Sequence, residues 1–157
     1  MHEASLPVPD PVEHVIQPEE RVESARSEQP PSRITAWWFR QGAEPIQVAI
    51  DQVPHLITED PNFVWVDLSD YTLDDLHLVG RLLGLDHQVL HAIHSPWHRP
   101  MLILYPGRFF VSATVPCLVP DAYRIHAGEL YLTVGNNVLV SAHKLPLPFT
   151  APILARA

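Results

Sequence analysis

The sequence predicts an α+β (mixed α/β) fold in which helices cover a mixed parallel and antiparallel β-sheet. Segments with the alternating or β-branched pattern of strands lie both before and after one block of helical periodicity, and there is no internal repeat. The 157 residues are 46% hydrophobic and only 18% charged, which supplies a core and favours one domain.

Residues 1–33 are expected to form a disordered, Pro/Glu-rich tail, and residues 34–157 the folded domain. Six of the 17 prolines lie in this first stretch, together with seven acidic residues and no aromatic one. Such a segment cannot bury enough apolar surface to offset the entropy lost on ordering. A binding arm is the alternative interpretation of the same residues.

The folded part opens with a predicted hairpin and a buried strand. Residues 34–39 are β-branched and aromatic, and residues 46–50 alternate after a turn, so the two segments read as paired strands. Residues 53–57 fit a short helical turn. The nearly continuous apolar run at 63–68, which contains Trp65, is typical of a strand covered on both faces.

A helix is predicted over residues 73–83. Thr72 and Asp75 form a near capping box at its start, and Gly84 stands where a C-terminal cap belongs. Its apolar side chains recur at helical spacing: Leu73, Leu76, Val79, Leu82 and Leu83. Trp65 is expected to be buried against Leu76 and Leu83 or their neighbours.

A second short helix, from about residue 86 to 94, is predicted to stop before Pro96. Strands then return, with a hairpin-type turn at residues 135–137 between the last two. The four predicted strands cover residues 101–105, 108–115, about 123–134, and 138–143.

The charge balance and motif content exclude several classes of function. With 10 basic and 18 acidic residues and one lysine, Lys144, the chain has little attraction for nucleic acid or anionic lipid. A single cysteine, Cys117, permits no intrachain disulfide. No signal peptide, no apolar run of about 20 residues and no phosphate-loop, nucleophile-elbow or metalloprotease motif is present. We therefore expect a soluble cytoplasmic chain that is not an enzyme.

One candidate metal site lies on the second helix. Four histidines follow one another at spacings of four, three and four: His87, His91, His94 and His98. His87 and His91 share a helix face, and neutral imidazoles at that spacing can hold Zn²⁺, Co²⁺ or Ni²⁺. Only Asp86 could add a nearby carboxylate, and Pro96 ends the helix before the fourth histidine. Ordinary surface histidines are the alternative.

A cluster of acids forms the other candidate, since carboxylate oxygens suit Mg²⁺ and Ca²⁺. Its members are Asp67, Asp70, Asp74 and Asp75. No 12-residue calcium-loop pattern is present. The alternative is that these are helix-start acids: Asp70 and Asp74 stand at the start of the helix over residues 73–83, where negative charge contributes roughly 0.3–1 kcal/mol per residue.

An ordered series of segments resembles the cytosolic N-terminal domain of CorA-like divalent-cation transporters. The series begins with a Trp-hydrophobic-Asp strand and a Leu-rich helix, and it closes with a hairpin that ends in hydrophobic-Ser-hydrophobic-His. Its segments are Phe63-Val-Trp-Val-Asp-Leu68, Leu83-Gly-Leu-Asp-His-Gln-Val-Leu90, His98-Arg-Pro100, Arg108-Phe-Phe-Val111 and Leu139-Val-Ser-Ala-His-Lys144. The resemblance covers about residues 34–150 and implies the CorA soluble-domain fold.

The resemblance also implies parts that this sequence lacks. Family members continue through a long stalk helix into two transmembrane helices with a Gly-Met-Asn signature, and they assemble as homo-pentamers. We therefore expect the chain, which stops at Ala157, to be truncated before the stalk and to reach the membrane only through those missing helices. The expected location is the cytoplasmic side of the cell membrane.

The sequence departs from the family at its acidic helix motif. His91 stands in the place of the first of two acids, and Ala92 in the place of the second, which contributes to a regulatory metal site between subunits in the family. Met101 replaces a basic residue of the following strand. A family Mg²⁺ site is therefore not carried over, and any metal site is expected at His87 and His91 with a softer ion.

The function predicted from these residues and this resemblance is a regulatory cytosolic domain of a CorA-like Mg²⁺/Co²⁺ transporter, with Mg²⁺, Co²⁺ or Zn²⁺ as the transported or sensed ion. The alternative is a stand-alone adaptor or partner-binding protein that has this fold and no transport function. The coding sequence beyond Ala157 distinguishes the two.

Overall fold

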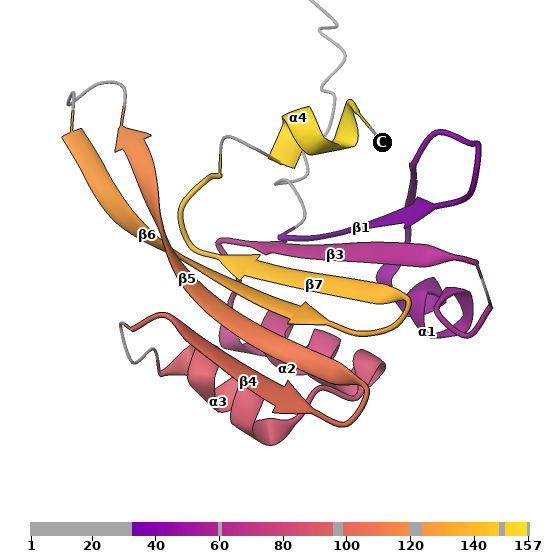
Figure 1. The fold of residues 1–157 in the computed structure, drawn as a ribbon, viewed down its shortest axis with the longest axis horizontal. Coiled ribbons are helices and arrows are strands. Elements are labelled where there is room, and N and C mark those ends of the chain that lie inside the picture. Colours follow the sequence, from indigo (N-terminus) through magenta and orange to yellow (C-terminus); the bar gives the residue numbers. More distant parts are fainter. Residues whose placement is uncertain (1–32, 60, 96–98, 120–123, 148–149, 157) are drawn as a thin grey trace, which may run out of the picture. The chain divides into compact units, whose positions relative to one another are not determined.

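The computed structural model describes residues 33–59, 61–95, 99–119, 124–147 and 150–156. Figure 1 shows the elements along the chain. In order they are β1 (Ile34–Phe39), β2 (Ile46–Val48), a 3₁₀ turn (Ile50–Gln52), α1 (Val53–Leu56), β3 (Phe63–Ser69), α2 (Leu73–Leu83), α3 (His87–His94), β4 (Met101–Tyr105), β5 (Arg108–Val119), β6 (Arg124–Val134), β7 (Val138–His143) and α4 (Thr150–Leu154). The tail expected over 1–33 lies, except for Arg33, outside the described residues.

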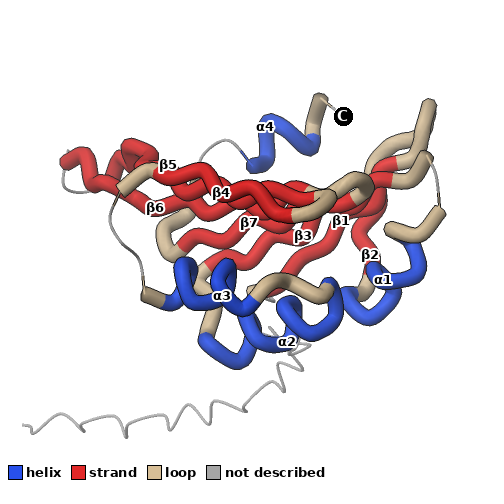
Figure 2. Tube along the Cα trace, turned by 60° about the horizontal axis from the view of Figure 1, so that its bottom comes forward, coloured by secondary structure: helices blue, strands red, loops and turns tan. Residues whose placement is uncertain are grey.

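The strands form a seven-stranded mixed sheet in the order β2-β1-β3-β7-β6-β5-β4. Neighbours are antiparallel except β3 and β7, which run parallel at the centre with Asp67 opposite Ser141. Helices α1, α2 and α3 cover one face of the sheet, which we call the helical face, and α4 lies on the other, the second face (Figure 2). The predicted α+β class and mixed sheet are confirmed.

Helix α2 begins and ends as its sequence predicts. The Thr72 hydroxyl accepts a hydrogen bond from the Asp75 backbone N–H, and the Asp75 carboxylate accepts one from the Thr72 N–H at 2.7 Å. Gly84 ends the helix in the left-handed region at φ 59°. Arg108 of β5 adds a tertiary cap, because its guanidinium donates to the carbonyls of Leu83 and Gly84 at 2.8 and 2.9 Å.

The main core lies between the helices and the helical face. Alternate residues of the central strands point into it, as the period of two requires. The buried cluster includes Val64, Val66 and Leu68 of β3, Val138 and Val140 of β7, Phe110 of β5, Leu76, Val79 and Leu83 of α2, and Val89, Ala92 and Ile93 of α3. A smaller buried cluster joins Cys117, Leu130 and Leu147.

The sheet face on which Trp65 lies differs from the one predicted. The side chain is buried, as expected, but it does not belong to the cluster that holds Leu76 and Leu83. The neighbouring Val64 and Val66 occupy the helical face, so strand alternation turns Trp65 to the second face. The run of apolar residues hid this alternation, because a strand buried on both faces has no polar side chain to mark its direction.

Two strand ends also differ from those predicted. The strand expected over 46–50 ends at Val48, because a 3₁₀ turn begins at Ile50 and the Gln52 side chain accepts a hydrogen bond from the Ala49 N–H at 3.2 Å. Strand β5 continues past residue 115 to Val119, paired throughout with β6.

Among the helices described, none is long and apolar enough to cross a membrane.

Candidate functional site

Helix α3 carries the two histidines predicted to bind metal. The Asp86 carboxylate caps the helix by accepting a hydrogen bond from the Gln88 N–H at 2.7 Å. Val89, Ala92 and Ile93 bury one side of the helix in the main core, which leaves the other side in solvent. His87 and His91 are both exposed, with ring centroids 6.4 Å apart and planes tilted by 39°.

This pair offers two imidazole ligands on consecutive turns. His94 is also exposed on α3, and His98 lies outside the described residues. Within the part of the chain that the structure describes, no group of three or more His, Cys, Asp or Glu side chains is placed to hold a metal ion. Zinc sites in proteins usually have four ligands. An ion at His87 and His91 would therefore need water or another molecule to complete its coordination, and the site stays a prediction.

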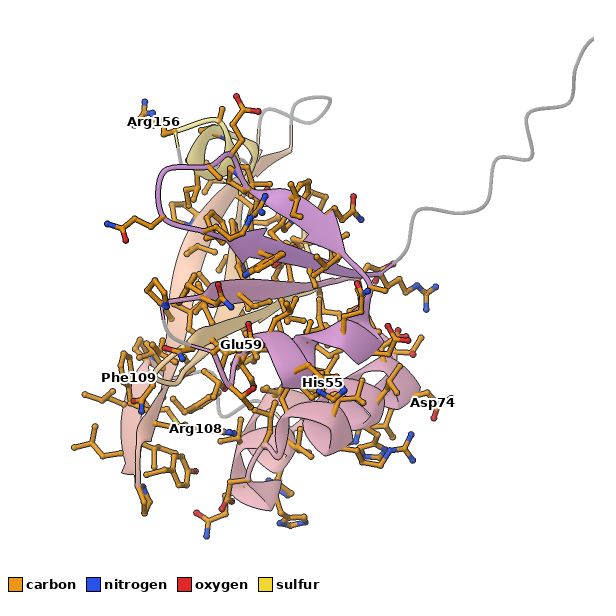
Figure 3. The ribbon with its side chains drawn as sticks, turned by 90° about the vertical axis from the view of Figure 1, so that its right-hand side faces the viewer. His55, Glu59, Asp74, Arg108, Phe109 and Arg156 are labelled. Atoms are coloured by element: carbon orange, nitrogen blue, oxygen red, sulfur yellow. The ribbon has the colours of Figure 1, made fainter. Side chains whose placement is uncertain are left out.

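The four acids are dispersed rather than gathered. Asp75 caps α2, and its hydrogen bonds from the Thr72 side chain and backbone lower the pKa of the carboxyl. Asp74, in the same first turn, points away from the protein (Figure 3). Asp70 is exposed, with a left-handed φ of 49°. Asp67 lies on the second face, so the helix-start interpretation accounts for Asp74 and Asp75 only.

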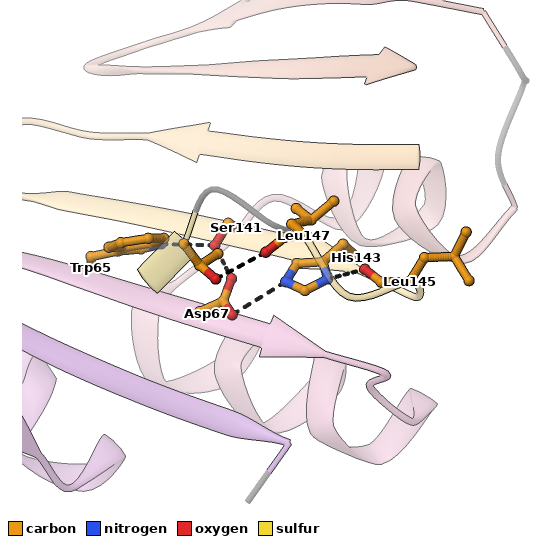
Figure 4. A network of polar contacts seen from close by, with 7 residues as sticks. Trp65, Asp67, Ser141, His143, Leu145 and Leu147 are labelled. Atoms are coloured by element: carbon orange, nitrogen blue, oxygen red, sulfur yellow. Dashed lines mark hydrogen bonds and ion pairs between the residues drawn. The ribbon is translucent and has the colours of Figure 1, made fainter. Parts of the chain in front are cut away.

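Sequence reasoning missed a polar cluster on the second face, made of Trp65, Asp67, Ser141 and His143; we call it the Asp67 cluster (Figure 4). The Trp65 indole Nε1–H donates to Ser141 Oγ at 2.8 Å, and the Ser141 hydroxyl donates to Asp67. The other carboxylate oxygen of Asp67 lies 3.2 Å from His143 Nε2. The cluster joins β3 to β7 across their parallel register.

The surroundings of His143 favour its protonated form. Its Nδ1 lies 2.7 Å from the carbonyl oxygen of Leu145, so both ring nitrogens face acceptors, and only the imidazolium can donate to both. Burial lowers the pKa of His143, but the hydrogen bond and charge of Asp67 and the Leu145 carbonyl outweigh it and hold the pKa above the ordinary 6.5.

The Asp67 cluster does not have the arrangement of a nucleophilic enzyme. An activated serine needs a base within hydrogen-bond reach of its hydroxyl. Here Ser141 and His143 both bind the Asp67 carboxylate, and the described structure has no hydrogen bond between them. The chemistry available is proton binding at His143 and fixation of the two central strands.

The signal for this cluster was present but incomplete in the sequence. Trp65 and Asp67 stand two residues apart in one strand, and Ser141 and His143 two apart in another. Each pair therefore shares a sheet face. That the two pairs are neighbours follows only from the parallel pairing of β3 with β7, which no local pattern encodes.

A cavity of about 710 Å³ opens near the first turn of α2, the end of α3 and the β5–β6 hairpin. Tyr71, Glu129, Tyr131 and Lys144 line part of it. The Tyr131 hydroxyl donates to Glu129, and the Lys144 ammonium donates to the Tyr71 carbonyl and lies 3.9 Å from the Tyr71 ring centroid. Burial, then the charge of Glu129, raises the pKa of Tyr71 to about 12, so this phenol stays neutral at physiological pH.

Comparison with solved structures relates this fold to known proteins. The full-length CmaX protein matches over 82% of this chain with a TM-score of 0.69 at 17% identity. The CorA magnesium transporter of Methanocaldococcus jannaschii matches over 80% with a TM-score of 0.58 at 13% identity. The ZntB cytoplasmic domain of Vibrio parahaemolyticus matches over 78% with a TM-score of 0.54 at 14% identity. No family model and no curated protein matches the sequence.

These matches show that the chain has the fold of a CorA-like cytoplasmic domain. At this level of identity the likeness concerns the fold alone. The chain spans 40% of the CmaX protein, 36% of the CorA transporter and 49% of the ZntB domain.

Proposed function

We propose that this chain serves as the cytoplasmic regulatory domain of a CorA-like divalent-cation transporter, with Mg²⁺ or Co²⁺ as the transported ion. The observation that carries the proposal is the fold: the same mixed sheet, matched over 80% of the chain, occurs in a CorA magnesium transporter. The match to the ZntB cytoplasmic domain, which covers 78% of this chain, supports the proposed cytoplasmic role.

The proposed mechanism is a coupling between ion binding and subunit packing. In a homo-pentamer, an ion held preferentially in one arrangement of the domains would shift the assembly toward that arrangement. The domain itself would neither conduct ions nor catalyse a reaction.

The ion sensed by this domain is proposed to be Zn²⁺ or Co²⁺, bound at His87 and His91. Ala92, at the position of the family's second acid, is buried in the main core and offers no ligand atom. Mg²⁺ requires oxygen ligands and holds its water tightly, whereas imidazole suits the softer ions. The exposed pair with ring centroids 6.4 Å apart is compatible with two ligands to one ion.

Calorimetric titration of the full chain with Mg²⁺, Co²⁺ and Zn²⁺ tests the ion assignment. We expect Zn²⁺ or Co²⁺ to bind at pH 7.5, and binding to weaken at pH 5.5 as the imidazoles protonate. The double variant His87→Ala/His91→Ala should lose this binding. The matched control His55→Ala/His77→Ala also removes two exposed helical histidines, neither of them on α3, and it should bind like the wild type.

Two results contradict the proposal in different ways. Mg²⁺ binding that survives His87→Ala/His91→Ala would reject the soft-ion site. Absence of ion binding at both pH values would reject ion sensing by this domain.

The transporter assignment is tested separately by immunoblotting membrane and soluble fractions of the source cells. A product found only in the soluble fraction favours the stand-alone adaptor.

A further inference from the structure

Strand β4 leaves one edge of the sheet unpaired. It is the last strand in the sheet order, and among the described residues it pairs only with β5. The Met101 N–H donates to the Ser112 hydroxyl of β5 at 3.1 Å, so the backbone groups of Met101 face into the sheet. Because this direction alternates along a strand, the N–H and C=O groups of Leu102 and Leu104 face outward.

The side chains of this edge are apolar and exposed. Leu102 and Leu104 are 62% and 76% exposed, and Leu104 lies opposite Phe109, which is also exposed. Charged residues, prolines and short length are the usual protections of an edge strand. The other edge, β2, is short and follows Pro45, whereas β4 has neither a charge nor a proline within Met101–Tyr105.

We propose that β4 is an interaction surface that pairs, antiparallel, with β4 of a second copy of this chain. A two-fold axis beside Ile103 would set Leu102 opposite Leu104 of the second copy, and each such pair would exchange both its N–H···O bonds. Met101 would then lie opposite Tyr105 of the second copy, and Ile103 opposite its counterpart. No cross-strand pair contains a charged side chain and the two central kinds of pair are aliphatic, so the strand is complementary to itself.

Charge also favours a second copy over a foreign peptide. The whole chain has a net charge of −8, which opposes self-association on most surfaces. The five residues of β4 carry no charge, so their pairing sets no like charges directly opposite each other. For the same reason the strand offers no charge that would select an acidic or basic peptide.

The pairing should be reversible, because the interface area that it buries is small. Stable protein interfaces bury about 1,200–2,000 Å² in total, and two five-residue edges bury less than this. The interface is isologous, which distinguishes it from the head-to-tail contacts of a ring. The inference therefore does not depend on the proposed transporter function.

Sedimentation equilibrium of the full chain between about 1 μM and 1 mM tests the proposal. We expect the apparent mass to rise from 17.7 kDa toward twice that value. Leu104→Pro removes an outward N–H while leaving the inward ladder intact, and edge strands tolerate proline at such a position. Two-fold symmetry doubles this loss, so dimerisation should weaken about tenfold or more.

A charged variant and a control distinguish pairing through β4 from nonspecific association of the protein. Leu104→Lys should also weaken the dimer, because it sets a charge in the apolar pair formed by Leu102 and Leu104. Ile125→Lys changes a side chain of similar exposure, 74%, away from β4, and it should dimerise like the wild type. Amide hydrogen exchange at Leu102 and Leu104 should slow as the concentration rises.

Three results would overturn the proposal. They are a mass of 17.7 kDa throughout the concentration range, a dimer that both Leu104 variants leave unchanged, or a higher oligomer without protection of the Leu102 and Leu104 amides. Circular dichroism of each variant confirms that it is folded before its mass is interpreted.

Discussion

Replacing Asp67 by Asn tests the role of the Asp67 cluster, because it removes the charge that holds His143 protonated. In the wild type, the folded-state pKa of His143 is above its ordinary 6.5. The folded state therefore binds this proton more tightly than the unfolded state. The resulting stabilisation is complete below about pH 6.5 and is lost as the pH rises through the folded-state pKa.

The expected magnitude follows from the hydrogen bonds of the cluster. Asp67 is nearly buried, with a side chain 14% exposed, and its bond to the imidazolium is charge-assisted. Such a bond contributes about 1.5–3 kcal/mol, whereas a neutral one contributes about 0.5–1.5 kcal/mol. Asp67→Asn should therefore lower the free energy of unfolding more at pH 5.5 than at pH 8.5, because the charge-assisted bond is lost as the pH rises through the folded-state pKa of His143.

Urea unfolding at pH 5.5, 6.5, 7.5 and 8.5, followed by tryptophan fluorescence, measures this difference. Asp75→Asn is the matched control, because Asp75 is also a hydrogen-bonded carboxylate but its pKa is lowered. Its stabilisation is present above the unfolded-state pKa and is lost only in acid, so its effect should be constant over this range. An effect of Asp67→Asn that is constant, or larger at pH 8.5, would refute the argument.

Two further changes test the packing. Trp65→Ala should lower the free energy of unfolding by about 3–5 kcal/mol, because it empties a buried site on the second face and leaves Ser141 without its indole donor. A loss under about 1 kcal/mol in urea unfolding would contradict this expectation. Arg108→Ala should cost about 1–3 kcal/mol, because the carbonyls of Leu83 and Gly84 lose their side-chain donor. Arg108→Lys should recover part of that loss in thermal unfolding, and equal stability of wild type and Arg108→Ala would show that water replaces the cap.

Local signals predicted much of the fold. The capping residues Thr72, Asp75 and Gly84 and the spacing of the leucines located α2, because each acts within one or two helical turns. The early end of β2 depended on a side-chain bond from Gln52 to the backbone, which competes with strand pairing and leaves no mark in the hydrophobic pattern.

The sequence predicted only the part of the candidate site whose residues lie close together along the chain. His87 and His91 lie together because both belong to one helix, whose geometry the spacing already fixes. Trp65 was assigned to the wrong face, and the Asp67 cluster was not foreseen. Both depend on the orientation and partner of β3, which are set by a strand some 70 residues later in the chain.

The central parallel pair has a consequence for how the chain can fold. β7 stands between β3 and β6, so without it the sheet separates into β2-β1-β3 and β6-β5-β4. The contact that closes the sheet joins residues 74 apart in sequence, such as Asp67 and Ser141. Closing so long a loop is entropically costly, and contacts of this separation form slowly. During synthesis one side of β3 therefore remains without its β7 partner until β7 has left the ribosome. Pulse-labelling hydrogen exchange would reveal this order as protection that reaches β3 and β7 together.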